Sequence, residues 1–250
     1  MKTDEKSTRV FRTDKEQKVG ARIAEIFSKS QDSVEFKIEC FPRYVRRQHL
    51  KRFLAMYEIF KRLLPVKGSI VECGVYGGFG LMSWAKISTI LEPENLTRRV
   101  YGFDSFEGLS PPTAHDQNGH KTVQRGDLFS PSYNELQELI KEYDDDRFLG
   151  HIPKIELIKG DITKTAKEFV TKNPHLIVSL LFLDCDLFEP TRAAIETFLP
   201  RMPKGAIVAF DELDNPIWPG ETNALLETIG INALRLERIE WDPYIAFAVL

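Results

Sequence analysis

The chain has 250 residues, 42% of them hydrophobic and 28% charged, which is the composition of a globular protein with one large core or two small ones. Its formal net charge of −3 excludes a general electrostatic attraction to nucleic acid or to an anionic membrane. The three cysteines show no CxxC spacing and so indicate neither a disulfide framework nor a zinc site. The charged N-terminus lacks the apolar core of a signal peptide, and no apolar run is long enough to span a bilayer, so we expect a cytoplasmic protein.

The N-terminal part of the chain is predicted to be helical. Apolar residues recur at helical spacing over residues 15–29 and, more strongly, over residues 43–64, where Pro65 and Gly68 end the second helix. We therefore expect an N-terminal helical cap over residues 1–66 and one compact sheet domain over residues 67–250. The cap is expected either to cover the active site or to form a contact in a homo-oligomer.

From Gly68 onward, short apolar strands alternate with helices. Residues 107–130 lack periodicity and predict a long loop of the kind that forms lids or binding loops. The tight Asp242-Pro243 turn is too short for a crossover helix, so the last two strands should be antiparallel. The predicted strands cover residues 69–75, 98–106, 154–161, 176–186, 205–213, 234–241 and 244–250, and the predicted helices between them cover residues 81–91, 133–145, 163–172, 191–199 and 221–229.

This order predicts an α/β fold: a Rossmann-like, mostly parallel seven-stranded sheet that ends in an antiparallel hairpin. Ligands bind such sheets at the carboxyl ends of the strands. The residues that follow each strand therefore decide which ligand is expected.

The first predicted strand ends in a glycine-rich turn, residues 72–78. Glycines let the backbone turn sharply and come close to a ligand. The carboxylate of Glu72 inside this turn would repel a pyrophosphate and suits a ligand with a cationic amino or sulfonium group. The alternative is a tight turn with a surface glutamate.

Acidic residues also end the second and third predicted strands. Asp104 lies one strand over from the glycine turn, where it can accept hydrogen bonds from both ribose hydroxyls of a nucleoside cofactor. Asp161 is placed to accept from an adenine amino group while Ile162 packs on the ring. For both aspartates the alternative is a helix cap.

Four carboxylates follow the fourth and fifth predicted strands: Asp184, Asp186, Asp211 and Glu212. They would repel one another strongly unless something compensates their charge, and a divalent cation would do so. Ligation by oxygen alone favours Mg²⁺ over zinc. The alternative interpretation makes these acids caps or salt-bridge partners of nearby basic residues: Arg192, Arg201 and Lys204.

The chain resembles the macrocin O-methyltransferase family, class I S-adenosylmethionine-dependent enzymes that methylate sugar hydroxyls in natural-product or surface-glycan pathways. The resemblance covers residues 68–218, and the paired acid motifs are its specific part. It is carried by the segments VECGVYGG, YGFDSFEGL, KGDI, FLDCDLFEPTRAAIE and GAIVAFDEL.

The resemblance implies S-adenosylmethionine as cofactor, Mg²⁺ as metal, and a sugar on a small molecule as acceptor. Asp184, Asp211 and Glu212 would hold the metal, and Asp186 would act as the general base. The family usually has two aspartates where this chain has Asp211-Glu212, and residues 215–222 depart from the family pattern in a way that suggests a different acceptor pocket. The residues expected to bind the cofactor are Glu72, Gly74, Tyr76, Gly78, Asp104, Ser105, Asp161, Ile162 and Asp184.

Other functions stay open at this point. A methyltransferase of an amine or of a catechol-like hydroxyl would keep the fold and the cofactor. The acid in the glycine turn and the terminal hairpin argue against a nicotinamide-dependent oxidoreductase, and the acid cluster argues against a non-catalytic module that only binds S-adenosylmethionine.

Two further features have a structural and a functional interpretation each. His115 and His120 in the long loop are alternative bases or polar lid residues, and we favour the lid. The basic stretch over residues 43–51 is expected to be the solvated face of a helix, with contact to an anionic acceptor as the alternative.

Overall fold

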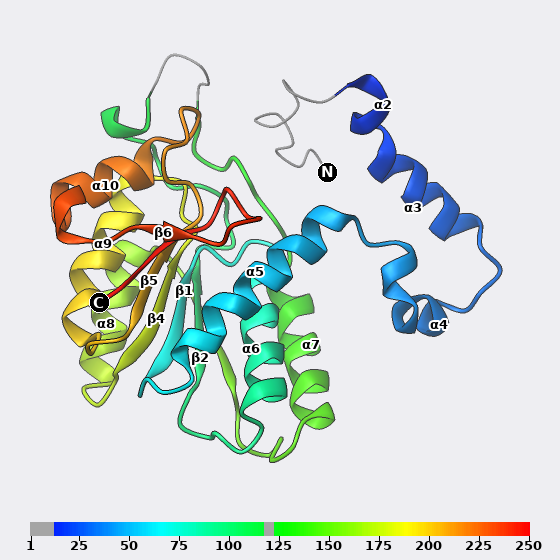
Figure 1. The fold of residues 1–250 in the computed structure, drawn as a ribbon, viewed down its shortest axis with the longest axis horizontal. Coiled ribbons are helices and arrows are strands. Elements are labelled where there is room, and N and C mark those ends of the chain that lie inside the picture. Colours follow the sequence, from blue (N-terminus) through cyan, green and yellow to red (C-terminus); the bar gives the residue numbers. More distant parts are fainter. Residues whose placement is uncertain (1–12, 118–122) are drawn as a thin grey trace. The chain divides into compact units, whose positions relative to one another are not determined.

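The computed structural model describes residues 13–117 and 123–250 of the chain (Figure 1). The chain divides into two compact units, residues 1–54 and residues 55–250. The second unit begins inside helix α5 (Arg47–Leu63), whose later residues are buried: Ala55, Met56, Ile59, Phe60 and Leu63. The predicted boundary between a helical cap (residues 1–66) and a sheet domain (residues 67–250) stays a prediction.

The first unit consists of short helices. The predicted helix over residues 15–29 is divided at Lys18 into α2 (Asp14–Gln17) and α3 (Val19–Lys29). Helix α4 (Val34–Glu39) and the 3₁₀ turn η1 (Phe41–Arg43) follow, and neither was predicted. Helix α4 is too short to show helical periodicity, although Ser33 caps it by accepting a hydrogen bond from the amide of Phe36.

The second unit contains the seven-stranded sheet predicted from the sequence, in the order β3-β2-β1-β4-β5-β7-β6. Neighbouring strands from β3 to β5 are parallel, and β7 is antiparallel to both β5 and β6, which confirms the predicted class. The strands are β1 (Ser69–Cys73), β2 (Val100–Asp104), β3 (Ile155–Lys159), β4 (Val178–Leu183), β5 (Ile207–Phe210), β6 (Glu237–Arg238) and β7 (Ala246–Val249).

Helices cover both faces of this sheet. Figure 1 shows α8, α9 and α10 on one side and α6 and α7 on the other. The bounds are α6 (Phe79–Leu91), α7 (Tyr133–Asp146), α8 (Ile162–Lys172), α9 (Phe188–Phe198) and α10 (Gly220–Thr228), with short 3₁₀ turns η2 (Ala114–Asp116), η3 (Leu199–Arg201) and η4 (Ile231–Ala233). Each long helix lies within a few residues of its predicted position.

The strand alternation divides the core between the two faces. Val71 and Cys73 of β1 join the cluster beneath α8 and α9. On the other face Trp84 of α6 packs edge-to-face on Phe182 of β4, with ring centroids 5.5 Å apart. Full burial of a large apolar side chain stabilises the fold by about 1.5–3 kcal/mol, so these residues fix the sheet between its helices.

The C-terminal hairpin is shorter than predicted. Only Glu237 and Arg238 of the expected strand over residues 234–241 pair with β7. The Asp242-Pro243 turn is part of a longer connection, in which buried Asp242 accepts a hydrogen bond from the amide of Tyr244 at 3.0 Å. Local hydrogen bonding in this connection replaces the ladder, and β6 remains a two-residue edge strand.

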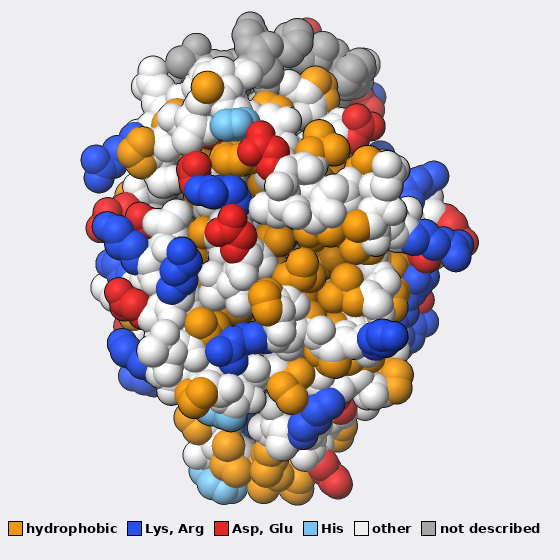
Figure 2. All heavy atoms as spheres, turned by 90° about the vertical axis from the view of Figure 1, so that its left-hand side faces the viewer, with side chains coloured by type: hydrophobic (Ala, Val, Ile, Leu, Met, Phe, Trp, Pro, Cys, Tyr) orange, Lys and Arg blue, Asp and Glu red, His pale blue; other side chains and the backbone are white. Residues whose placement is uncertain are grey.

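Hydrophobic side chains gather on part of the surface that carries α9 and α10, as Figure 2 shows. Leu226 of α10 and Ile231 beyond it are each nearly half exposed. Among the helices of residues 13–117 and 123–250, none has the length and hydropathy needed to cross a membrane.

Candidate active site

The carboxyl ends of four strands meet at one edge of the sheet. Cys73, the last residue of β1, is in register with Phe103 of β2 on one side and Leu183 of β4 on the other, and Leu183 is in register with Phe210 of β5. The segments that follow these strands therefore lie next to one another. The chain runs from β1 outward to β2 and β3 and then returns to β4, so β1 and β4 flank the switch point where such sheets bind ligands.

Gly74 lets the backbones after β1 and β4 come into direct contact. Its φ is +95°, and a Cβ atom there would lie 1.8 Å from the carbonyl oxygen of Asp184. The amide of Asp184 donates to the carbonyl of Cys73 at 2.8 Å, which fixes the approach. A residue with a side chain does not fit this position.

Glu72 lies beneath the glycine-rich turn and not on the surface. Its side chain is 1% exposed. A Cβ atom on Gly80, in the first turn of α6, would lie 2.5 Å from its Oε1 atom. The N-terminus of α6 favours a negative charge at this place. The contact between Glu72 and a cationic group of the cofactor stays a prediction.

Asp104 holds the glycine-rich turn in place. Its Oδ2 atom accepts hydrogen bonds from the amides of Val75 and Tyr76, both at 2.8 Å, and Oδ1 accepts from the amide of Phe106 at 2.6 Å. Ser105 closes a local turn, since its hydroxyl donates to the carbonyl of Gly108. Asp104 therefore couples the ends of β1 and β2, and its predicted contact with ribose hydroxyls is untested.

The other predicted cofactor residues differ in exposure. Asp161 caps α8 by accepting from the amide of Thr163 at 3.0 Å, and Ile162 is buried in the core cluster. Tyr76 is 42% exposed and has a φ of +50°. Gly78, with a φ of +83°, packs against Leu136.

The segment after β4 contains a strained aspartate. Asp186 has a φ of +61°, a conformation that costs a non-glycine residue on the order of 1 kcal/mol and that is frequent at functional sites. Asp184 and Asp186 are partly buried, and Asp211 after β5 is 9% exposed. Two of the basic residues considered as their partners contact other groups. Arg192 pairs with Glu189 and Glu196, and Arg201 donates to backbone carbonyls.

Glu221 is a fifth acid at this edge, and it was not predicted. It lies in the first turn of α10, is fully buried, and accepts hydrogen bonds from the amides of Cys185, Asp186 and Glu212. Burial raises the pKa of its carboxyl group well above the usual value, and the charges of Asp184, Asp186 and Asp211 raise it further. Because Glu221 bonds to the backbone of Asp186 and Glu212, the acids after β4 and β5 lie close to it. An acid directly after Pro219-Gly220 at a helix start is the only local feature that marks it.

The donor set is suited to Mg²⁺ by its chemistry but is not assembled around one point. Within residues 13–117 and 123–250, no group of three His, Cys, Asp or Glu side chains is arranged to hold a metal ion. The carboxylate of Glu212 accepts a hydrogen bond from the side-chain amide of Asn215. Burial raises the pKa of the Cys73 and Cys185 thiols well above their usual values, so neither is suited to act as a thiolate ligand or nucleophile.

The long loop is fastened to α9 and α10. Asp116 accepts from the amide of Phe188 at 2.7 Å, and the ring of His115 stacks on that of Phe188 at 4.0 Å between centroids. His115 also pairs with Glu227 at 3.0 Å, and Asn223 donates to its carbonyl oxygen. These contacts fix His115 against α9 and α10, and the lid interpretation stays a prediction. His120 lies outside the described residues.

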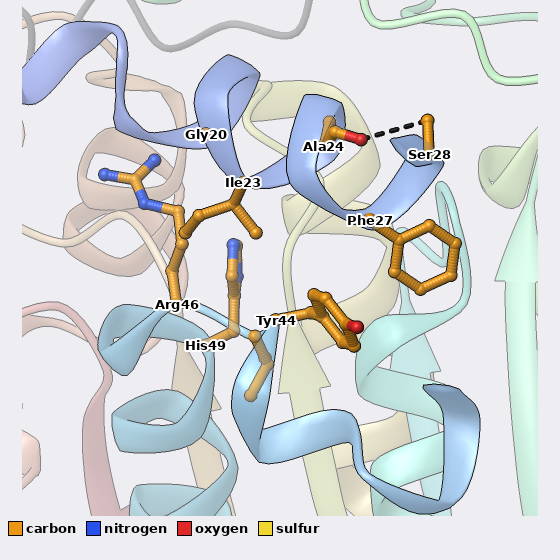
Figure 3. A pocket seen from close by; sticks show the side chains of 9 residues that line it. Gly20, Ile23, Ala24, Phe27, Ser28, Tyr44, Arg46 and His49 are labelled. Atoms are coloured by element: carbon orange, nitrogen blue, oxygen red, sulfur yellow. Dashed lines mark hydrogen bonds between the residues drawn. The ribbon is translucent and has the colours of Figure 1, made fainter. Parts of the chain in front are cut away.

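The first unit has a pocket of its own, of about 370 Å³ (Figure 3). Figure 3 shows Arg46, His49 and Tyr44 facing Ile23 and Phe27 of α3. Arg43 instead pairs with Asp32 at 3.0 Å. The basic stretch is therefore not a uniform solvated face, because Arg46 and His49 line a cavity with apolar walls.

Comparison with known proteins identifies the class. The family model described as Macrocin-O-methyltransferase (TylF) matches residues 44–227. A structure of CalS11, a calicheamicin methyltransferase, is 31% identical, covers 100% of this chain and 98% of that chain, and superposes with a TM-score of 0.92. An apo structure of CalS11, described as a TDP-rhamnose 3′-O-methyltransferase of calicheamicin biosynthesis, is 30% identical, with 95% of each chain covered and a TM-score of 0.82.

A more distant structure shares the fold. The O-methyltransferase NovP is 19% identical, with 80% of this chain and 79% of that chain covered and a TM-score of 0.59. Among curated protein sequences, none matches this chain significantly.

The sheet order, the family match and the similarity to CalS11 identify the chain as a class I methyltransferase that depends on S-adenosylmethionine. The chain belongs to the macrocin O-methyltransferase family.

Proposed function

We propose that this enzyme transfers the methyl group of S-adenosylmethionine to a hydroxyl group of a sugar, on a small-molecule acceptor of a natural-product or surface-glycan pathway. The observation that carries the proposal is the similarity to CalS11, which extends over the whole chain and whose described acceptor is TDP-rhamnose. The acidic groups at the strand ends add support, because deprotonation of a weakly acidic sugar hydroxyl needs a base nearby.

In the proposed reaction, the acceptor oxygen attacks the methyl carbon of the sulfonium in line with the departing sulfur. The O–C bond forms while the C–S bond breaks, so that S-adenosylhomocysteine leaves as a neutral thioether. Asp186 takes the proton of the hydroxyl as general base. The turn over residues 72–78 and Asp104 hold the cofactor beside it.

The proposal includes Mg²⁺, which Asp184, Asp211 and Glu212 would hold. Carboxylate oxygens are the ligands that Mg²⁺ prefers, and the ion would compensate part of the repulsion within the acid cluster. When bound, it would lower the pKa of a coordinated sugar hydroxyl and orient it. A cytoplasmic location and self-association through the N-terminal helices stay predictions.

The test is a panel of acceptors incubated with the full chain and S-adenosylmethionine. We expect a methylated product from TDP-rhamnose or a related nucleotide sugar, detected by mass spectrometry and located on a sugar oxygen by NMR. A catechol and a primary amine serve as acceptors of the competing classes. Methylation of one of these, with none on any sugar, would contradict the proposal.

The same assay tests the metal separately. Treatment with EDTA should lower the rate by at least about tenfold, and excess Mg²⁺ should restore it. A rate that survives chelation would remove Mg²⁺ from the mechanism and leave sugar methylation intact.

A further inference from the structure

Glu221 connects the two acid motifs of the active site. Helix α10 starts close to the segment after β4, because Gly220 has no side chain: a Cβ atom there would lie 2.6 Å from the carbonyl oxygen of Asp186. This approach places the next residue, Glu221, beneath both motifs with no solvent exposure.

The two oxygens of Glu221 serve different motifs. Oε1 accepts from the amides of Cys185 at 3.1 Å and Asp186 at 3.3 Å, after β4. Oε2 accepts from the amide of Glu212 at 3.1 Å, after β5. One side chain thus satisfies three backbone donors and links two strand ends that no turn of the chain connects.

An acid at this position carries a cost that an apolar residue would avoid. Burying a carboxylate among other carboxylates is unfavourable, and only its hydrogen bonds offset that cost. A packing role alone would be met better by leucine or methionine of similar volume. The acid is suited to one task, which is to accept from the three amides.

The two residues that follow Glu221 in the first turn of α10 contact further segments around the site. The hydroxyl of Thr222 accepts from the amide of Asp214 at 3.1 Å, beyond β5, and the side chain of Asn223 donates to the carbonyl of His115 in the long loop at 2.7 Å. Three successive residues of α10 therefore bind three different segments around the site.

We propose that Glu221 is a positioning residue for methyl transfer: through the backbone of Cys185, Asp186 and Glu212 it holds the two acid motifs in their relative place without touching donor or acceptor. The inference rests on the proposed function, because it assigns the acid motifs to the reaction.

The test compares Glu221→Gln with Glu196→Gln, a substitution of an exposed acid on α9. Glutamine keeps the volume of the side chain but has one acceptor oxygen, so its NH₂ group faces the amides of one motif and releases them. We expect kcat to fall by roughly 10–100-fold in Glu221→Gln, with KM for the acceptor and the calorimetric Kd for S-adenosylmethionine within about twofold. Glu196→Gln should behave as the unaltered enzyme.

Amide hydrogen exchange of the ligand-free chain gives a readout that needs no activity. In Glu221→Gln, peptides that contain residues 184–188 or 211–214 should exchange faster, while a peptide over β3 keeps its rate. Equal acceleration in all peptides, or an unchanged kcat, would overturn the proposal in favour of a general structural role.

A second variant and a second readout cover the cases in which the first variant does not fold or the enzyme methylates no sugar. If Glu221→Gln does not fold, Glu221→Asp takes its place, because it keeps both oxygens on a shorter arm and should show the same local exchange with a smaller loss of kcat. If the unaltered enzyme methylates no sugar, the proposed function fails, and local exchange at the acid motifs still decides whether Glu221 positions them.

Discussion

Single residues determine how closely the backbones approach one another at the carboxyl edge of the sheet. Gly74 and Gly220 each stand where a Cβ atom would overlap a neighbouring backbone, and in both cases that backbone carries an acid of the predicted site. Asp104 and Glu221 then fix the resulting contacts by accepting backbone amides. These contacts hold the backbone of three acids of the predicted site: Asp184, Asp186 and Glu212.

Gly74→Ala should destabilise the enzyme by about 3 kcal/mol. The new Cβ atom would overlap the backbone of Asp184, and alanine is strained at a φ of +95°. The measurement is the midpoint of urea unfolding followed by circular dichroism. Gly77→Ala is the matched control, since nothing lies within 4 Å of its Cβ position. Equal stability of the two variants would contradict the close approach of the Gly74 backbone to the carbonyl oxygen of Asp184.

The sequence predicted the acids that end strands and missed the acid that supports them. Asp104, Asp184 and Asp211 follow apolar runs, so strand position alone marks them. Glu221 bonds to an amide 36 residues earlier in the chain, and no local pattern reports such a contact. Burial of Glu72 beneath α6 was equally hidden, because it depends on how Gly80 packs.

The loop over residues 107–130 packs against the segment that follows β4, next to the acids of the predicted site. On one side of residues 118–122, Asp116 and His115 fasten it to α9 and α10. On the other side, Val123 packs with Leu187 and Trp218. The loop is therefore anchored on both sides of residues 118–122, against residues that closely follow Asp186.

Asp116→Ala should loosen this loop. The substitution leaves the buried amide of Phe188 without its acceptor, at a cost of about 1–3 kcal/mol. We expect trypsin to cleave after exposed Arg125 roughly tenfold faster, as measured by mass spectrometry. Asp127→Ala is the control, because that side chain accepts from the amide of Gln124 within the same loop. Equal cleavage in the two variants would contradict the anchoring.

Long elements were predicted well and short ones poorly. The parallel strands are near-continuous apolar runs, because helices cover both faces of the sheet, and the long helices have apolar periodicity. Helix α4 has six residues and β6 has two, so neither presents a period. In the final hairpin, local bonds around Asp242 shorten the strand that the apolar pattern extends.

At the scale of the whole molecule, the sheet has the strand order of a class I methyltransferase, and acids follow the carboxyl ends of its central strands. Membership of the macrocin O-methyltransferase family agrees with this architecture. The division of tasks follows from topology: β1 and β2 carry the predicted cofactor side, while β4 and β5 carry the acids proposed to act on the acceptor. Helix α10 joins the acid motifs to each other and to the loop.

The most direct test of this account is calorimetric titration of the full chain with S-adenosylmethionine and, separately, with NAD. The account predicts saturable binding of S-adenosylmethionine with one site per chain and no binding of NAD, since the buried carboxylate of Glu72 lies beneath the glycine-rich turn and disfavours a pyrophosphate on it. Binding of NAD without binding of S-adenosylmethionine would contradict it.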